Sequence, residues 1–548
     1  MKKYKDTHQH QQQLLPPNLD ELIDENHLVR VVDEFVSRLS PTVWDKAFKG
    51  GGAPSYHPQM MLKIILFAYS SRIFSSRQIA KAVRQDVTFM WVAGMQRPSF
   101  NTINRFRSDY FRDILEDVFT ELLNFLHEKG YVNFKDYFID GTKLEADAGR
   151  YTYVWGKNTK RFKAAVQERI RKLFEEIEAL NTDEDEKYGE NDLPERGTDT
   201  EISSEEIYRA AVALNEQVED IKEKKLKRAL RSRAKKLKKE ADKQKKYEEQ
   251  QENLAGRNSY SKTDIGGTFM RLKDGRLRAA YNLQVSTENQ FIMNYSISQS
   301  ASDPVSFPDH LEKIEQRGQK YIPNNYNGDS AYGSEENYSL LREKEINNYL
   351  KYNTFHTEEK KKEKDKFHHD NFIYNKKSDT YQCPEEKILR YQETITRKTK
   401  TGYVSFIDVY ACSDCGNCPK KNECLQGKSC RRIHRNPLLE FYRQQARDNL
   451  NSQKGIELRK RRGPETETYF GDLKGNSGFK RFLLRGEEKV EHEAGLQAIG
   501  YNLRKIAIKR ASKAVLKAKY ILCQKNILIY LLKTTFFENF RYCMEFST

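Results

Sequence analysis

The stretch Tyr137-Phe-Ile-Asp-Gly-Thr142 ends a short apolar run on an aspartate and follows it with a glycine. Much later in the chain, Asn327-Gly-Asp-Ser-Ala-Tyr-Gly333 again places an aspartate before small residues, here serine and alanine. A strand would fix the backbone of each aspartate, and the small residues that follow would turn the chain away and leave the carboxylate open to substrate. The two stretches therefore predict strands of a mixed α/β domain that present Asp140 and Asp329 to a common site.

A third acidic stretch, Glu465-Thr-Glu-Thr-Tyr-Phe-Gly-Asp-Leu-Lys474, follows Pro464, where we expect a helix to begin. Glu467 would bring a third carboxylate to the site from the side, and Glu465 is the rival for that position. Mg²⁺ prefers a few carboxylate oxygens together with water and substrate phosphates. Two such ions about 3.5–4 Å apart activate a water or a 3′-hydroxyl and stabilise the leaving oxygen. Each acid alone is typical of a cap or a surface charge, but together they predict metal-dependent catalysis on a polyanion.

The composition favours an anionic partner. The 548 residues carry a formal net charge of +17, and the release of counterions drives basic proteins onto phosphate backbones. A basic surface without a partner is the alternative. Residues 1–14 are polar and Gln-rich, and the most apolar C-terminal stretch, residues 527–532, is too short to span a bilayer. We therefore expect a cytoplasmic, nucleoid-associated protein with no membrane partner.

Residues 18–130 show the periodicity of helices, and the end of this part carries three short helical units at 75–83, 87–92 and 99–107. This triplet has the proportions of a helix-turn-helix unit. Phe100, Ile103 and Phe106 are predicted to face inward in the third helix. The residues predicted to face outward are of the types that read base edges or hold phosphates, namely Asn101, Asn104, Arg105 and Arg107. An ordinary surface helix is the alternative.

Two insertions interrupt the predicted α/β domain. Residues 158–256 are charged and helical, with a predicted hairpin whose long helix, 207–251, either is solvated or contacts DNA through its basic segment. Residues 354–435 are Lys-rich, irregular and hold most of the cysteines. The predicted organisation is an all-α N-terminal domain and an α/β catalytic domain that these insertions divide, with boundaries at 1–130 for the first and at 131–157, 257–353 and 436–548 for the second.

The cysteines form a second constellation. Cys412-Ser-Asp-Cys415-Gly-Asn-Cys418 is followed by Cys424 and Cys430, at spacings that suit tetrahedral zinc. Free thiols are the alternative. We expect Cys415, Cys418 and Cys424 as ligands, with either Cys383 or Cys412 as the fourth. Such a Zn²⁺ site would be structural, because the insertion is too polar to fold alone.

With these stretches in place, the chain resembles a DDE transposase of a bacterial insertion sequence, and within that class the insertion-sequence eleven-eighty-two group. The resemblance covers nearly the whole chain. Ser330 stands where alanine is usual. The motifs that carry the resemblance are Asp140-Gly-Thr-Lys-Leu-Glu-Ala, Tyr281-Asn-Leu-Gln, Asp329-Ser-Ala-Tyr-Gly-Ser-Glu-Glu-Asn-Tyr and Glu467-Thr-Tyr-Phe-Gly-Asp-Leu-Lys474, the last followed by Gly478-Phe-Lys-Arg-Phe-Leu-Leu-Arg-Gly486.

The resemblance implies an RNase H-like catalytic domain in which Asp140, Asp329 and Glu467 are the triad that binds two Mg²⁺ ions, with Mn²⁺ as a substitute. It also implies that Lys474 contacts DNA. Related families carry an arginine four residues before the glutamate. Gly463 stands there in this chain, and Arg461 and Arg462 lie just upstream as candidate phosphate contacts.

The activity that the resemblance implies begins with binding to the terminal inverted repeats of a mobile element. The protein would then cut the strands and join the 3′ ends to target DNA, working on double-stranded DNA as a homo-oligomer. An RNase H-like nuclease without strand transfer and a catalytically inactive, transposase-derived DNA-binding protein are the alternatives.

Overall fold

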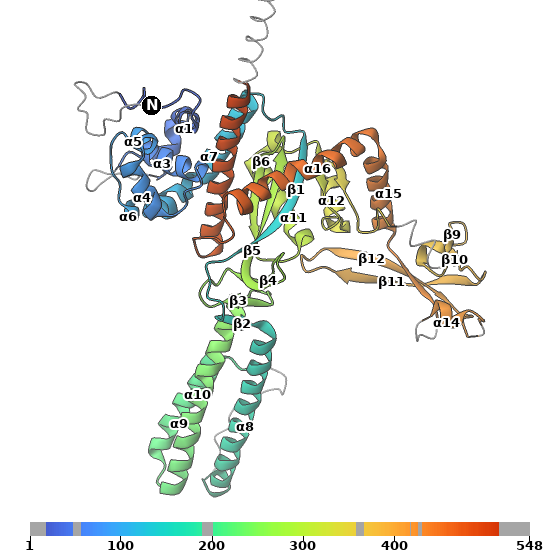
Figure 1. The fold of residues 1–548 in the computed structure, drawn as a ribbon. Coiled ribbons are helices and arrows are strands. Elements are labelled where there is room, and N and C mark those ends of the chain that lie inside the picture. The colour runs from blue at the N-terminus through green and yellow to red at the C-terminus, as the bar shows by residue number, and fades with distance from the viewer. Residues whose placement is uncertain are drawn as a thin grey trace, which may run out of the picture.

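The structure is a computed structural model that describes residues 18–47, 56–188, 201–357, 366–416, 418–425 and 430–513. The apolar C-terminal stretch 527–532, together with Cys523 and Cys543, lies outside the described residues. A helical N-terminal part and a central sheet lie side by side, and a helical arm and a β-rich part project from the sheet (Figure 1). Within these ranges, no helix is both long and apolar enough to cross a membrane.

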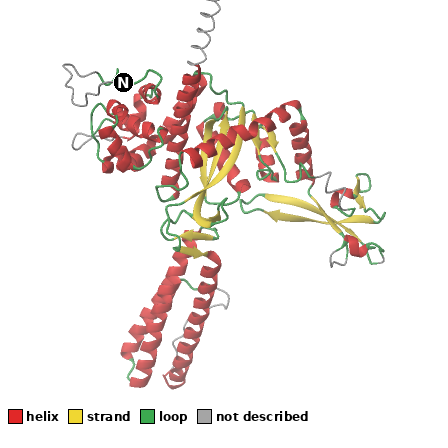
Figure 2. Ribbon diagram, viewed as in Figure 1, coloured by secondary structure: helices red, strands yellow, loops and turns green. Residues whose placement is uncertain are grey.

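The N-terminal part is helical, as the sequence predicts (Figure 2). In the predicted triplet, Asp86 caps the second helix and Ser99 caps the third. Their side chains accept backbone N–H groups of the first turn of each helix. Phe100 is 39% exposed rather than inward-facing as predicted, whereas Ile103 and Phe106 are buried. The helices are α1 (Leu28–Ser37), α2 (Pro41–Ala47), α3 (Pro58–Ser70), α4 (Ser76–Gln85), α5 (Val87–Val92), α6 (Phe100–Arg105) and α7 (Leu115–Glu128).

The central sheet is mixed. β1 (Asp136–Glu145) lies in its middle, antiparallel to β5 (Leu277–Glu288) and parallel to β7 (Asn325–Gly328). β8 (Asn347–Leu350) continues the sheet parallel to β7, and both β6 (Phe291–Ser298) and β4 (Thr268–Arg271) pair with β5. Helices α11 (Asp303–Arg317) and α12 (Glu335–Glu343) connect β6 to β7 and β7 to β8. The mixed α/β domain that the sequence predicts is confirmed.

The two aspartate strands end differently. β7 ends at Gly328, and Asp329 begins the turn that follows it, as predicted. The predicted turn after Asp140 is wrong, because β1 continues through Gly141 to Glu145 in register with β5. Gly141 suits this position because the side chains of Gln284 and Asp303 occupy the space that its Cβ would take. Asp140 is therefore held inside a strand.

Helix α16 (Gln453–Gly471) crosses the sheet after α15 (Pro437–Asn451) and contacts β1, β5 and β7. The prediction that the helix begins near Pro464 is wrong. It begins eleven residues earlier, where the Ser452 side chain accepts the backbone N–H of Gly455 at 3.0 Å, and Pro464 lies inside it. A π-helical turn (Asp472–Asn476) follows, and a last helix runs over residues 487–513.

The first insertion is an arm of three helices, α8 (Gly156–Tyr188), α9 (Ser204–Asp220) and α10 (Lys224–Leu254), with β2 (Tyr153–Trp155) and β3 (Ser259–Ser261) paired at its base (Figure 1). Leucine, isoleucine, valine and alanine side chains from all three helices form a separate core. The predicted single helix over 207–251 is wrong, because the chain is extended at Ile221 and divides it into α9 and α10. The predicted hairpin is thus a three-helix bundle.

The second insertion is a five-stranded antiparallel sheet, so the prediction of an irregular block is wrong. Its order is β13 (Arg432–Arg435), β12 (Val404–Cys412), β11 (Ile388–Lys398), β10 (Thr380–Gln382) and β9 (Ile373–Asn375). β11 and β12 form a long ribbon (Figure 1). A small cluster that includes Tyr381, Leu389 and Tyr410 forms the core of this sheet beside the cysteines.

Candidate active site

Asp140 lies on β1, and Asp329 lies directly after the end of the neighbouring parallel strand β7. Phe138 on β1 is opposite Asn327 on β7, and two residues further along both strands the register brings the aspartates together. Arg462 from α16 reaches both of them, with its Nη2 at 3.8 Å from Asp140 Oδ2 and at 3.5 Å from Asp329 Oδ2. Two acids far apart in the sequence thus share one guanidinium group.

The two aspartates differ in their surroundings. Burial raises the pKa of Asp140, and the charge of Asp329 also raises it, whereas Arg462 and the backbone N–H of Gly141 lower it. That N–H donates to Asp140 Oδ1 at 2.8 Å, and the Thr466 hydroxyl donates to Oδ2 at 3.4 Å. The Asp329 side chain is 39% exposed and accepts a hydrogen bond from the Ala331 N–H at 2.9 Å. Asp140 is the desolvated member of the pair, and Asp329 is the accessible one.

Helix α16 lies along β1 with one face toward the aspartates. Arg462 and Thr466, one turn apart, contact Asp140, and Lys474 donates to Thr142 Oγ1 at 2.6 Å and to the Lys143 carbonyl at 2.9 Å. Burial and the nearby charge of Lys273 lower the pKa of Lys474 to about 8. Lys474 therefore joins the helix to the strand two residues after Asp140.

Glu467 and Glu465 lie on either side of Thr466 but in different environments. Glu465 is 5% exposed, accepts the Gln290 N–H at 2.6 Å and pairs with Arg461 at 3.3 Å. Glu467 is exposed. Over the described part of the chain, no three His, Cys, Asp or Glu side chains form a group that could hold a metal ion. The structure thus brings Asp140 and Asp329 together and leaves Glu467 as the solvent-facing glutamate of the same helix.

Arg461, a candidate phosphate contact from the sequence, makes several polar contacts within the protein. Its guanidinium reaches Asp136 at 3.3 Å and Asn289 at 3.4 Å in addition to Glu465, and it lies 5.1 Å from the centre of the Phe138 ring. Its partners come from β1, from the β5–β6 turn and from its own helix, so it anchors α16 on the sheet.

In the N-terminal part, Asn101, Asn104 and Arg105 are exposed, as predicted. The prediction for Arg107 is wrong, since it is 4% exposed and donates to Tyr69 Oη at 3.1 Å and to the Phe74 carbonyl at 2.9 Å. The reason is that α6 ends at Arg105 and continues as a π-helical turn, Phe106–Tyr110. The wider turn changes the face on which each following side chain lies.

Asp303 is an acid at this site that the sequence analysis missed. It accepts hydrogen bonds from Asn282 at 2.8 Å and from Gln284 at 3.0 Å. Burial raises the pKa of the Tyr332 hydroxyl, and the charges of Asp303, Asp140 and Asp329 raise it further. The sequence signal that could have identified Asp303 is its position before a proline, at the start of the helix that follows β6.

The oxygen donors of this site suit a hard divalent cation. Asp140 and Asp329 come from adjacent strands, and the raised pKa of Asp140 reflects burial that a nearby positive charge would offset. Mg²⁺ takes one or two carboxylates together with substrate phosphates rather than a complete protein cage. Two aspartates with one accessible side fit that preference.

Two family models match the chain. Transposase domain (DUF772) matches residues 17–109, which include α1 to α6, and Transposase DDE domain matches residues 382–507, which include Glu467. No curated protein matches the chain. Both models describe transposase domains, a class of protein that acts on DNA, so the chain is similar to transposases at both ends of its described part. The two matches are those of a DDE transposase of an insertion element, a family that generally uses a divalent metal.

Proposed function

We propose that this protein is the transposase of an insertion sequence of the eleven-eighty-two group. It binds the terminal inverted repeats of its element, cleaves the DNA strands and transfers the 3′ ends to target DNA. The observation that carries the proposal is the pair formed by Asp140 on β1 and Asp329 directly after the parallel strand β7, both reached by Arg462 of α16. Neither aspartate lies in a stretch that a family model matches, so the pairing is an argument independent of the comparisons.

The strand order supports an RNase H-like catalytic domain. β6, β5 and β1 are consecutive antiparallel neighbours, and β7 and β8 continue the sheet parallel to β1 on its other side. The order β6-β5-β1-β7-β8 places one aspartate on the central strand and the other directly after its parallel neighbour. The first insertion lies between β1 and β4 in the chain, and the second lies between β8 and α15. Both leave the pairing of the sheet's strands continuous.

In this proposal Asp140 and Asp329 hold the divalent ions, and Glu467 completes the ligand set from α16. When bound, paired Mg²⁺ ions activate the attacking water or hydroxyl and stabilise the leaving oxygen. Arg462 holds the two carboxylates together against their mutual repulsion, and Thr466 orients Asp140 through its hydroxyl. Both are positioning residues in this account.

Binding to DNA is assigned to two basic surfaces. Asn101, Asn104 and Arg105 form the exposed side of α6 and its end in the N-terminal part. On the arm, α10 carries exposed basic side chains at spacings of three, four or seven residues, so they lie along one face of the helix. They are Arg228, Arg231, Lys235, Lys238, Lys239, Lys245 and Lys246. A continuous row of this kind suits the evenly spaced phosphates of a duplex.

The test is cleavage of plasmid-borne element ends in Mg²⁺. Asp140→Asn and Asp329→Asn are expected to abolish cleavage and to retain a gel shift with the ends, while Asp274→Asn, at an exposed turn, retains both. Cleavage by either site variant at the rate of the unchanged protein would refute the site. Cleavage without joined products would identify a nuclease, and a gel shift without any cleavage by the unchanged protein would identify a DNA-binding protein only.

A further inference from the structure

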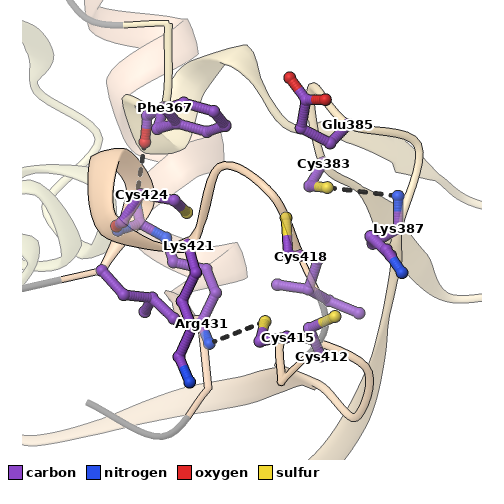
Figure 3. Close-up of a pocket in the computed structure, with 12 residues that line it drawn as sticks. Phe367, Cys383, Glu385, Lys387, Cys412, Cys415, Cys418, Lys421, Cys424 and Arg431 are labelled. Carbon is purple, nitrogen blue, oxygen red and sulfur yellow. Dashed lines mark hydrogen bonds between the residues drawn. The ribbon is translucent and has the colours of Figure 1, made fainter. Parts of the chain in front are cut away.

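Five cysteine thiols surround one small pocket in the second insertion (Figure 3). Cys383 follows β10, Cys412 ends β12, Cys415 and Cys418 lie in the loop after β12, and Cys424 ends α14 (Lys421–Cys424). The pocket encloses about 20 Å³, which is room for one particle the size of a water molecule. All six cysteines within the described ranges are free thiols.

Backbone N–H groups point at three of these sulfur atoms. The Lys387 N–H donates to Cys383 Sγ at 3.2 Å, and the Arg431 N–H donates to Cys415 Sγ at 3.4 Å. The backbone N–H of Asp414 donates to the sulfur of Cys412. A donor aimed at sulfur stabilises the thiolate, which is the form that binds metal. The turns around the pocket are thus shaped to accept negative charge on sulfur.

Positive side chains complete this environment. Lys387, Lys421 and Arg431 line the same pocket, and Lys387 also pairs with Asp414. Four thiolates around a divalent zinc ion carry a net charge of −2, which neighbouring cations offset.

Four of the five thiols lie outside the strands of the sheet, in turns and in α14. The Cys424 thiol interacts electrostatically with those of Cys415, Cys383 and Cys418. These four come from three separate pieces of chain, namely the β10–β11 turn, the loop after β12 and α14. Cys412 is 2% exposed and is the last residue of β12, opposite Leu389, and its thiol also interacts with those of Cys415 and Cys383.

We propose that Cys383, Cys415, Cys418 and Cys424 bind one Zn²⁺ ion, and that Cys412 is not a ligand. No completed metal site exists among the side chains of the residues that the structure describes, so the four thiols turn toward the pocket centre as the ion enters. Tetrahedral coordination by four cysteines is a form that structural zinc adopts. Each thiol that binds releases its proton to solvent, four in all, so that zinc affinity rises with pH.

The ion would fix a part of the chain that contacts the catalytic domain. At the far end of the β11–β12 ribbon, Thr401 donates to Glu336 at 2.7 Å and Tyr403 donates to Glu335 at 3.2 Å, both on α12. Asn436, which caps α15, also donates to Glu335. Zinc would therefore order an insertion that lies between the Asp329 strand and the glutamate helix.

The test is the zinc content of the full chain, purified with a reductant and measured by mass spectrometry. The proposal expects one zinc per chain, lost in Cys383→Ser and Cys415→Ser and retained in Cys412→Ser and Cys430→Ser. Zinc-free protein after growth with added zinc, or zinc retained in both Cys383→Ser and Cys415→Ser, would overturn it. Loss in Cys412→Ser with retention in Cys383→Ser would overturn the choice of ligands.

A second measurement uses the unchanged protein, so it tests the zinc site even where a cysteine variant fails to fold. The unchanged protein, exchanged into Co²⁺, is expected to show the intense thiolate charge-transfer absorption and the visible bands of a tetrahedral tetrathiolate site. A weak, octahedral spectrum would contradict the proposal. Asp140→Asn provides the distinction from the proposed function, because it is expected to lose cleavage and keep its zinc.

Discussion

Asp140 lies on β1 and Asp329 directly follows β7, each two residues beyond Phe138 and Asn327, the last paired positions of these parallel strands. One guanidinium group, that of Arg462, lies within 4 Å of both carboxylates. The pairing follows from strand register, so the arrangement does not depend on the flexible ends of long side chains. The predictions below start from this relationship.

Replacement of Asp140 by asparagine should stabilise the protein at neutral pH while it removes cleavage. Burial raises the pKa of Asp140 above its value in the unfolded chain, so ionisation costs folding free energy. This cost is absent below the unfolded pKa and grows as pH rises through the folded pKa. We expect the free energy of unfolding to rise by about 1 kcal/mol at pH 7.5 and the gain to vanish near pH 3. Denaturant unfolding at the two pH values measures it, and an equal gain at both would contradict the account.

Arg462→Gln should move the acid limb of the cleavage profile to higher pH. Arg462 lowers the pKa of Asp140, so its removal makes the carboxylate harder to ionise. Cleavage of element ends between pH 5.5 and 8.5 is the measurement, with a several-fold loss expected at the acid end and partial recovery at the alkaline end. Lys460→Gln, at an exposed position on the same helix, is the control and should leave the profile unchanged.

Loss of the Lys474 charge should weaken the binding of DNA at alkaline pH. Because burial lowers its pKa to about 8, its charge is lost as pH rises from 7 to 9, and a phosphate contact would be lost with it. Lys474→Arg keeps the charge, since arginine remains protonated throughout this range. We expect binding of element ends to weaken above pH 8 in the unchanged protein and to weaken less in Lys474→Arg. Parallel loss in both proteins would show that the charge of Lys474 is not used.

Gly333→Ala should destabilise the region around Asp329. A Cβ at Gly333 would overlap the Lys351 carbonyl and approach Tyr338 Oη to 2.7 Å, and such overpacking costs about 1–3 kcal/mol. Gly471→Ala is the matched control, because nothing lies within 4 Å of the Cβ position there. Denaturant unfolding of the two variants should give a lower midpoint for the first and an unchanged or higher midpoint for the second.

The basic face of α10 should contribute to the salt dependence of DNA binding. Replacing Lys235, Lys238 and Lys239 together by glutamine removes up to three phosphate contacts, which would reduce the slope of log K against log salt by about 2–3. The same change at three exposed basic positions of α8, Lys157, Lys160 and Arg171, is the control. Identical slopes for the unchanged protein and the α10 variant would mean that this face is only solvated.

The sequence allowed the strands of Asp140 and Asp329 to be predicted because apolar runs with turn residues are local signals. The continuation of β1 past Gly141 was not predictable, since it depends on pairing with β5. Arg107 faces inward because of a π-helical turn, which leaves no mark in hydrophobic spacing. The β11 strand is exposed at nearly every position and so lacks the alternation that identifies strands.

At the site, the choice between Glu465 and Glu467 also required tertiary contacts. Glu465 meets the β5–β6 turn through Gln290, a partner that is remote in sequence. Asp303 was missed for the same reason, because its role depends on Asn282 and Gln284 of β5. Short motifs thus indicated the chemistry of the site, and strand pairing determined which neighbouring side chains complete it.

The central claim is that Asp140, Asp329 and Glu467 act as metal ligands in DNA cleavage. The most direct measurement is cleavage by the three single variants in which each acid is replaced by cysteine, in Mg²⁺ and in Mn²⁺. Thiolate is a poor ligand for Mg²⁺ and a better one for the softer Mn²⁺. The account predicts no cleavage in Mg²⁺ and measurable recovery in Mn²⁺ for each variant, and cleavage in Mg²⁺ at the rate of the unchanged protein would contradict it.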